Sequence, residues 1–522
     1  MPVPSAPLPL RRHAPALLTA LIGTLVLLVW RPPSTDLANQ TFRAAIFRRA
    51  PFAPWNNLWF AGHHTPADYL LTPLFGSVLG AVAVGVLAAW LAAWAGSLLV
   101  HHLAATVPNL RRPTLAAVAF ALGSLASLFG GRTAFVLGSA FGALAVRAAL
   151  RGRWWLAALF GVLTSAGNPV AGLFVAVIGC AVLCARSVPW KPGLALVVAP
   201  LVPVGVLTVL FPEGGDFPFP LGGAANTLVA VAVVVVLGWS FRTLRWLGFG
   251  YAALTLICAL FVTPVGGNVA RLAAVGAPVA VVLLARLRWQ IVGVLLVALL
   301  ALQWAPISLA WTGRRAPTEA AFYRPLLDVL AARPGPIRVE VVPVVSHTEA
   351  DVVARAVPLA RGWSRQLDRK DNPLFYADHL DPAAYLRWLQ DLGVSVVAIA
   401  DTPLDIAGRR EAELLASPPS YLHEIHRDAV WRVYEVVPAP TLVDGNAGLT
   451  AIDVDSFTLD AGKYPAEATV KVHFSPWMRV TSGSGCVREA PGGWTAVTFT
   501  GGPLRVAASI TLHGLLHRHG DC

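Results

Sequence analysis

The residues best suited to chemistry lie in a long loop, residues 31 to 66, between the first two apolar stretches of the chain. Asp36 stands near the start of this loop, and Arg43 follows within a segment, 36 to 49, that mixes apolar and basic residues. A carboxylate can accept a proton from a hydroxyl group, and a guanidinium can hold a phosphate by two parallel hydrogen bonds. The loop therefore combines a candidate base with a candidate phosphate ligand.

Other polar residues could line the same site. In and just after the loop these are Gln40, Asn56, Trp59, His63, His64, Asp68 and Tyr69. Among the later apolar stretches they are Asn168, Glu213, Asn268 and Arg271. Polar groups at membrane depth are costly unless they line a cavity. The hydropathy pattern puts these positions on the same side as Asp36, so we expect one outward-facing pocket.

Each candidate also has a simpler interpretation. Asp36 precedes an expected helix and could cap it. Segment 36 to 49 could be an amphipathic helix that touches only bulk lipid headgroups. His63 and His64 are adjacent, and adjacent side chains point apart on most backbones, which disfavours a shared metal ion. The later polar positions lie in turns rich in Gly and Pro, where such residues are common.

The elements that must position these residues are apolar. Hydrophobic residues make up 56% of the chain, which is above the ~45–50% apolar content of soluble domains. The mean hydropathy of the chain is +0.63. A helix of ~20 apolar residues crosses a bilayer. We predict about eleven spanning helices at 14–30, 77–104, 114–130, 133–150, 154–167, 169–185, 192–211, 223–240, 247–263, 272–286 and 290–311.

The loop charges predict an orientation. Alternate short loops each carry a pair of basic residues: Arg111 and Arg112, Arg151 and Arg153, Arg186 and Lys191, Arg242 and Arg245, Arg286 and Arg288. The positive-inside rule then places the N-terminus in the cytoplasm and the C-terminal region outside the cell membrane. The net charge of +12 follows from these loops, so we expect a lipid bilayer and no nucleic acid as the partner.

The polar C-terminal region divides into two predicted domains after a transmembrane domain, residues 1–311. Residues 312–438 alternate strand-like and helical runs, which favours an extracytoplasmic α/β domain. Its segment 360–376 carries stacking and hydrogen-bonding groups that suit either a carbohydrate surface or an ordinary packed loop. Residues 439–522 form short strands with Gly and Pro turns, which favours a β-rich domain. Cys486 and Cys522 could pair there or remain free thiols.

Sequence motifs link the first ~80 residues to a known superfamily. The run TDLANQ after the first span, followed by WNNLWFAGHHTPADYLLTP, resembles the start of GT-C superfamily glycosyltransferases. With FPEGGDFPF, TPVGGNVARL and RGWSRQLDRKDNPLFY, the whole chain resembles a group of actinobacterial polytopic membrane proteins. The fold class expected is thus a polytopic α-helical, GT-C-like membrane protein with an extracytoplasmic α/β and β-rich region.

The GT-C resemblance implies a reaction. Such enzymes take a sugar from a polyprenyl-phosphate donor and transfer it to an acceptor, here a glycan or lipid of the cell envelope. Asp36 matches the loop acid that serves as their catalytic base. Many members carry two adjacent acids, often with a divalent cation, whereas Asp36 follows Thr35, so the metal requirement stays open.

Two other classes of function stay open. One is a transporter or flippase of a lipid-linked glycan, and the other is a non-catalytic envelope assembly factor. The sequence has no internal repeat of the kind common in secondary transporters, which favours the enzyme over the transporter. It also has no P-loop or nucleophile-elbow motif, which argues against ATP use and against hydrolase chemistry of that type.

Overall fold

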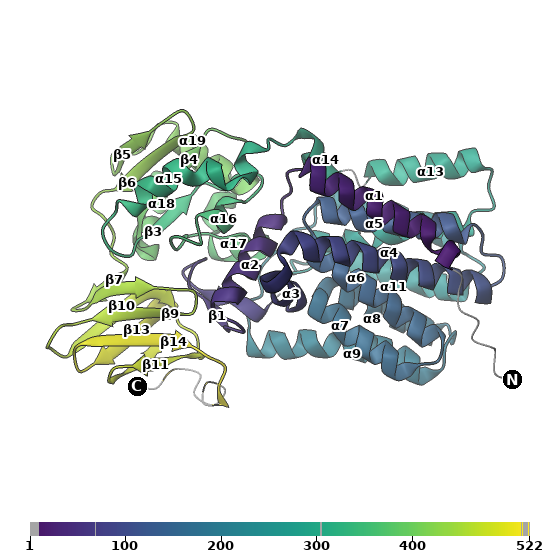
Figure 1. Ribbon diagram of the computed structural model, residues 1–522, viewed down its shortest axis with the longest axis horizontal. Helices are drawn as coiled ribbons and strands as arrows, with labels where there is room; N and C mark the ends of the chain where they lie inside the picture. The colour runs from purple at the N-terminus through teal and green to yellow at the C-terminus, as the bar shows by residue number, and fades with distance from the viewer. Residues whose placement is uncertain (1–9, 68, 303–304, 513, 515–519, 521) are drawn as a thin grey trace. The chain divides into compact units, whose positions relative to one another are not determined.

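The computed structural model describes residues 10–67, 69–302, 305–512, 514, 520 and 522, and Figure 1 shows its elements. The chain forms two compact units. The helical unit comprises residues 1–37, 68–206 and 217–313, and the sheet-containing unit comprises residues 38–67, 207–216 and 314–522. The long first loop is thus divided: Asp36 belongs to the helical unit, whereas residues 38–67 belong to the other.

The helical unit is built from apolar helices that lie side by side (Figure 1). They are α1 (Ala14–Trp30), α3 (Leu71–Leu79), α4 (Ala81–Thr106), α5 (Pro113–Phe129), α6 (Thr133–Leu150), α7 (Trp154–Gly167), α8 (Pro169–Cys184), α9 (Trp190–Leu210), α10 (Leu221–Leu237), α11 (Arg242–Leu260), α12 (Ala270–Leu284), α13 (Trp289–Leu302) and α14 (Ala305–Thr312).

Among the described residues, five helical segments are long and apolar enough to cross a membrane. These are α4, α6, α9, α11 and Gly266–Leu284, which joins a 3-10 turn to α12. Shorter apolar helices of 10–17 residues accompany them, among them α1, α5, α7, α8, α10 and α13. The helical unit is therefore that of a membrane protein, whereas the number of about eleven crossings stays a prediction.

One segment expected as a single helix is divided. Gly80, at a φ of 86°, separates α3 from α4 within the run predicted at 77–104. In the run predicted at 290–311, helix is described at residues 289–302 and 305–312, and residues 303 and 304 lie outside the described residues. By contrast, the break expected at Asn168 is present, because Asn168 caps α8 and Pro169 occupies its first turn.

Small side chains bring the central helices close together. Ala88, Ala89 and Ala92 of α4 pack against Leu125 of α5 and Val136 of α6 in one buried cluster. Hydrophobic burial does not drive helix association within lipid, so close packing of small residues is the main source of contact energy there. The alanine-rich sequence therefore supplies the helix interfaces of this unit.

The sheet-containing unit has a four-stranded sheet with strand order β3-β4-β6-β5. Its strands are β3 (Arg338–Val341), β4 (Val394–Ala400), β5 (Leu422–Arg427) and β6 (Trp431–Val436). β3 and β4 are parallel, and the other pairs are antiparallel. Around the sheet lie α15 (Arg324–Ala331), α16 (Glu349–Val352), α17 (Arg365–Asp371), α18 (Pro382–Leu392) and α19 (Arg409–Leu415).

Both faces of this sheet are buried, each in its own core. Alternate residues of β4 serve the two faces: Val396 lies in the core that includes α15, and Val397 in the core that includes α18 and α19. A strand covered on both sides must be apolar throughout, which explains the continuous apolar run of β4. The sheet thus places the carboxyl ends of β3 and β4 at one edge of the unit.

The C-terminal part is a β-sandwich. One sheet has the order β12-β13-β10-β7 and the other β11-β14-β9-β8. The strands are β7 (Val443–Gly445), β8 (Gly448–Ile452), β9 (Ser456–Asp460), β10 (Ala466–His473), β11 (Met478–Ser482), β12 (Gly485–Glu489), β13 (Trp494–Phe499) and β14 (Pro503–Ala508). Their inner faces share one core that contains Phe457, Val470 and Trp477. A disulfide joins Cys486 to Cys522.

The residues of the long loop complete this unit. Helix α2 (Leu37–Arg49) is followed by the short strands β1 (Trp55–Asn56) and β2 (His63–His64), which pair antiparallel. Between the strands, Phe60 and Ala61 have positive φ angles of 56° and 55°. Non-glycine residues rarely adopt this conformation, so the turn is held by its surroundings rather than by its own sequence.

Candidate active site and a buried ionic network

The backbone of Asp36 is held by the turn between α5 and α6. The Asp36 N–H donates to the carbonyl oxygen of Gly130 at 3.3 Å. Gly131 has a φ of 78°, and a Cβ there would lie 2.3 Å from the backbone nitrogen of Leu37. Only glycine fits this close approach in this conformation. The turn therefore fixes the backbone position from which the Asp36 side chain extends.

Two arginines lie near the Asp36 carboxylate. Arg132, the next residue in the turn, donates from Nε to Asp36 Oδ2 at 3.2 Å, with both side chains about a quarter exposed. Arg271, in the first turn of α12, interacts electrostatically with Asp36, Arg132 and Tyr69. The Arg271 guanidinium also lies 5.4 Å from the ring centre of Phe135 in α6. One carboxylate, two guanidinium groups and one phenol thus meet at the ends of α5, α6 and α12.

Tyr251 of α11 holds the start of α12 in place. Its hydroxyl donates to the carbonyl oxygen of Val269 at 2.6 Å and accepts from the N–H of Ala273 at 3.0 Å. These two backbone groups flank Arg271 on either side. A buried hydroxyl that satisfies two free groups of a helix start fixes its orientation. Tyr251 therefore positions Arg271 from a neighbouring helix.

The other candidates of the helical unit lie in buried turns. Asn168 accepts from the N–H of Ala171 at 3.1 Å as the cap of α8, and Asn268 lies in the 3-10 turn before α12. Tyr69 is buried, with 8% of its surface exposed. Asp68 lies outside the described residues. Among these four, the described contacts bring Tyr69 to the Asp36 cluster.

The remaining candidates belong to the sheet-containing unit and are buried. Arg43 donates to the carbonyl oxygen of Thr65 at 2.8 Å, and Trp59 stacks on Phe42 with ring centres 4.1 Å apart. Gln40 is 6% exposed and Asn56 fully buried, its side-chain oxygen accepting from the N–H of Leu58. These contacts are those of a packed core.

His63 and His64 also have partners in the core. His63 stacks on Trp59, and His64 Nδ1 lies 2.9 Å from Glu213 Oε1. Burial alone would raise the pKa of Glu213, but the hydrogen bond from His64 and the nearby imidazole of His63 lower it. Glu213 therefore ties the loop before α10 to strand β2.

The residues around Asp36 do not fit a divalent cation. Hard cations need several oxygen ligands, commonly carboxylates. The described charged neighbours of Asp36 are instead arginines, Arg132 and Arg271. Within the described ranges, no group of three or more His, Cys, Asp or Glu residues could hold a metal. The site suits a phosphate anion better than a metal ion.

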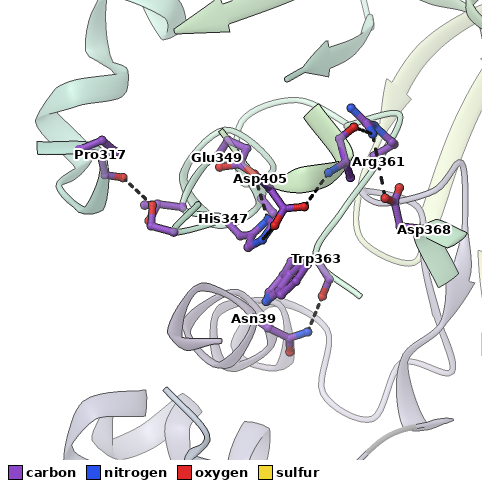
Figure 2. A network of polar contacts seen from close by, with 12 residues as sticks. Asn39, Pro317, His347, Glu349, Arg361, Trp363, Asp368 and Asp405 are labelled. Carbon is purple, nitrogen blue, oxygen red and sulfur yellow. Dashed lines mark hydrogen bonds and ion pairs between the residues drawn. The ribbon is translucent and has the colours of Figure 1, made fainter. Parts of the chain in front are cut away.

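The sheet-containing unit has a second polar cluster, shown in Figure 2. His347 is 2% exposed and stacks on Trp363, with ring centres 3.4 Å apart. Its Nδ1 lies 3.5 Å from Glu349 and its Nε2 lies 3.4 Å from Asp405. Asp405 also accepts two hydrogen bonds of 2.7 Å from Arg365. His347 is thus held between two carboxylates and an aromatic face.

The charges of this cluster shift its titration. Burial alone would lower the pKa of His347, but Asp405 and Glu349 outweigh it and raise the pKa. Burial would raise the pKa of Asp405, but His347 and Arg365 lower it far below its ordinary range. His347 also has a positive φ of 54°, a costly conformation for a non-glycine residue. The surrounding contacts compensate for that strain.

A third group of charges links the strands and helices of the same sheet. Arg361 donates to Glu340 of β3 at 2.6 Å and to Glu411 of α19 at 2.5 Å. Its guanidinium also lies 3.6 Å from the ring centre of Phe375. Tyr385 of α18 donates to Glu411 at 2.6 Å. Glu340, Glu411, Phe375 and Tyr385 are all buried, so this network braces the α/β core rather than exposing a reactive group.

The sequence signals for the site were incomplete. Arg132 was visible only as one basic residue on the side where basic residues are rare, and its partner Asp36 lies 96 positions away. Tyr251 has no local pattern that separates it from other aromatic residues in spans. Both roles depend on contacts between helices, which an isolated sequence does not display.

Comparison with solved structures finds similarity to the arabinofuranosyltransferase AftD from mycobacteria. One cryo-EM structure matches with a TM-score of 0.44 and 14% identity over 99% of this chain and 59% of that one. Two classes of a mutant of the same enzyme match with TM-scores of 0.42 and 0.41. This chain thus spans about three fifths of the length of those proteins. Similarity at this level does not transfer an activity.

No protein-family model and no curated protein matches this chain.

Proposed function

We propose that this chain is a membrane glycosyltransferase. It transfers a sugar from a polyprenyl-phosphate donor to a glycan or lipid acceptor of the cell envelope. The reaction takes place at the outer face of the cell membrane, with Asp36 as general base. The observation that carries the proposal is the cluster of Asp36 with Arg132 and Arg271 at one end of the helices. This cluster offers a proton acceptor beside two cations that cannot lose their charge at neutral pH.

The reaction assigns each group one role. Asp36 accepts the proton of the acceptor hydroxyl as the hydroxyl oxygen forms a bond to the anomeric carbon of the sugar. The bond between that carbon and the donor phosphate breaks, and the phosphate oxygen keeps the electron pair. General-base assistance of this kind contributes roughly 10²–10⁴ in rate.

The departing phosphate gains negative charge, which the arginines are placed to stabilise. Arg132 uses Nε for its bond to Asp36, and its two Nη groups have no hydrogen-bond partner among the described residues. They can bind phosphate in the bidentate geometry typical of arginine. Arg271, fixed by Tyr251, supplies the second cation. Preorganised charge of this kind costs no rearrangement during the reaction.

The orientation follows from the loop charges and is supported by the disulfide. Cys486 and Cys522 form a disulfide, and such bonds persist in oxidising, extracytoplasmic compartments. A reporter fused after residue 522 should be active only outside the cytoplasm. Cytoplasmic activity of the reporter would overturn both the orientation and the location of the reaction.

The function is tested with purified protein in lipid nanodiscs and radiolabelled polyprenyl-phosphate sugars. Asp36→Asn preserves size and helix-capping ability, so it should fold and bind donor but lose transfer by ~10²–10⁴. Asp68→Asn is the matched control and should lose far less. Arg132→Gln should raise the KM for the donor and lower kcat.

Two outcomes would change the assignment. An Asp36→Asn variant that transfers sugar at the parent rate would leave Asp36 as a structural residue. If the parent protein transfers sugar from none of the donors, a flippase of a lipid-linked glycan or an envelope assembly factor becomes the better assignment. Transbilayer movement of a fluorescent lipid-linked glycan in liposomes then separates these two.

A further inference from the structure

The sheet-containing unit has a cavity that the proposed reaction does not use. Its volume is about 420 Å³, within the roughly 300–1,000 Å³ usual for small-ligand sites. It lies at the carboxyl end of β4, beside the turn that joins β5 to β6. Ligands of open sheets with parallel strands commonly bind at that end of the strands. The cavity is therefore where a binding site is expected in this fold.

The backbone that lines the cavity is held in place. The N–H of Asp401 donates to the carbonyl oxygen of Val430 at 2.7 Å. The N–H of Thr402 donates to the carbonyl oxygen of Ala400, the last residue of β4, at 2.9 Å. Asp401 and Thr402 are thus positioned by the sheet itself, which lowers the entropy lost when a ligand binds.

Three lining groups are available to a ligand. The Thr402 hydroxyl oxygen is shielded from solvent and has no hydrogen-bond partner in the described part of the chain. The Asp401 carboxylate likewise has no described partner, and Arg432 makes only one long hydrogen bond, of 3.5 Å, to the carbonyl oxygen of Leu415. A buried hydroxyl without a partner costs free energy that a bound hydroxyl ligand would recover.

The other charged lining groups already have hydrogen-bond partners. Arg427 donates to both oxygens of Glu424. Asp428 accepts from the N–H groups of Val430 and Trp431 and from His426. The lining charges left without a described ion pair or a close hydrogen bond are one carboxylate, Asp401, and one guanidinium, Arg432, which are opposite in sign. The Asp401 carboxylate would repel a phosphate, and the Arg432 guanidinium would repel a divalent cation, so neither ligand suits the cavity.

We propose that this cavity binds one sugar residue of a neutral glycan. Neighbouring hydroxyls of a sugar ring can donate to the Asp401 carboxylate and accept from the Arg432 guanidinium and the Thr402 hydroxyl. The aliphatic side chains of Ile399 and Leu404, which also line the cavity, suit the C–H face of the ring. The cavity then anchors the acceptor glycan, a role that rests on the proposed glycosyltransferase function.

The binding test uses the full-length protein in nanodiscs and fluorescent hexasaccharides. The probes are a neutral arabinan, a neutral galactan and an acidic oligogalacturonate, and affinity is measured by thermophoresis. At least one neutral probe should bind the parent protein more tightly than the acidic probe. Thr402→Val, which nearly preserves shape, should weaken that binding about tenfold, as the loss of one buried hydrogen bond implies.

Two further variants and one control complete the test. Asp401→Asn and Arg432→Gln should each weaken binding of the neutral probe by about tenfold or more. Thr450→Val, on an exposed strand of the β-sandwich, should leave it unchanged. The proposal is overturned if the parent binds neither neutral probe, if the acidic probe binds more tightly, or if all three cavity variants bind like the parent.

Transfer activity is scored separately, so the two proposals can fail independently. If the cavity variants lose glycan binding while Asp36→Asn retains transfer, the cavity proposal stands and the assignment of Asp36 fails. If Asp36→Asn loses transfer while the cavity variants bind like the parent, the glycosyltransferase assignment stands and the cavity proposal is overturned.

Discussion

Replacing His347 by glutamine should make the sheet-containing unit less stable at acidic pH and should have a smaller effect at alkaline pH. The raised pKa of His347 reflects Asp405 and Glu349, which hold its imidazolium form against the opposing effect of burial. A group with a raised folded-state pKa stabilises the fold fully below its ordinary value, about 6.5. That stabilisation is lost as the pH rises through the raised pKa.

The neighbouring groups define the rest of the pH window. The lowered pKa of Asp405 means that its contribution is present above about 3.9 and is lost as the pH falls through the lowered value. The raised pKa of Glu349, caused mainly by burial, weakens the fold as the pH rises. Arg365 stays charged throughout. The cluster should therefore be most stable near about pH 4, weaken above that as the effect of Glu349 sets in, and weaken further above about pH 6.5 as the contribution of His347 is lost.

The magnitude follows from the contacts that the variant loses. His347 lies 3.5 and 3.4 Å from its two carboxylate partners, and it is 2% exposed. A hydrogen bond to a charged group contributes about 1.5–3 kcal/mol, and breaking a buried ion pair costs about 3–5 kcal/mol. Since glutamine retains some hydrogen bonding, we expect a loss of about 3 kcal/mol at pH 5.5. That corresponds to roughly a hundredfold loss of amide protection.

Hydrogen exchange of residues 344–354 in the full-length protein measures this directly, at pH 5.5, 7.0 and 8.5, after correction for intrinsic exchange rates. The parent should lose protection as the pH rises, and His347→Gln should show a much flatter profile. His423→Gln, at an exposed position of β5, is the control and should behave like the parent. Equal protection of parent and His347→Gln at pH 5.5 would refute the ionic role of His347.

Three further predictions concern stability and positioning. Arg361→Met leaves two buried carboxylates unpaired and should cost about 3–5 kcal/mol, seen as a lower thermal midpoint, whereas the surface substitution Arg410→Met should cost less than about 1 kcal/mol. Tyr251→Phe should leave expression unchanged but lower kcat/KM for the donor by about tenfold, mainly through KM, because Arg271 loses its fixed position; an unchanged KM would remove Tyr251 from this role. Cys486→Ser opens a disulfide that spans 36 residues and should destabilise the β-sandwich by about 3–4 kcal/mol in denaturant titration, so an unchanged midpoint would contradict a structural role for the bond.

The sequence alone determined the kinds of elements and their order. The apolar runs that predict spanning helices coincide with helices such as α4 and α6, because helix formation within lipid depends mainly on local composition. The continuous apolar run of β4 predicts a buried strand, which the sheet contains. Asn168 and Pro169 predict a helix break, because proline cannot continue a helix and asparagine caps one well.

Only the tertiary structure decided which distant residues meet. Arg132 lies beside Asp36, and Asp405 lies beside His347, because helices and strands pack there rather than because of any spacing in the sequence. The tertiary structure also decided to which unit each residue of the long loop belongs: Asp36 belongs to the helical unit, and Arg43 belongs to the core of the sheet-containing unit. Local patterns report the burial and period of each element, whereas partners of buried charges are chosen by three-dimensional packing, which has no period along the chain.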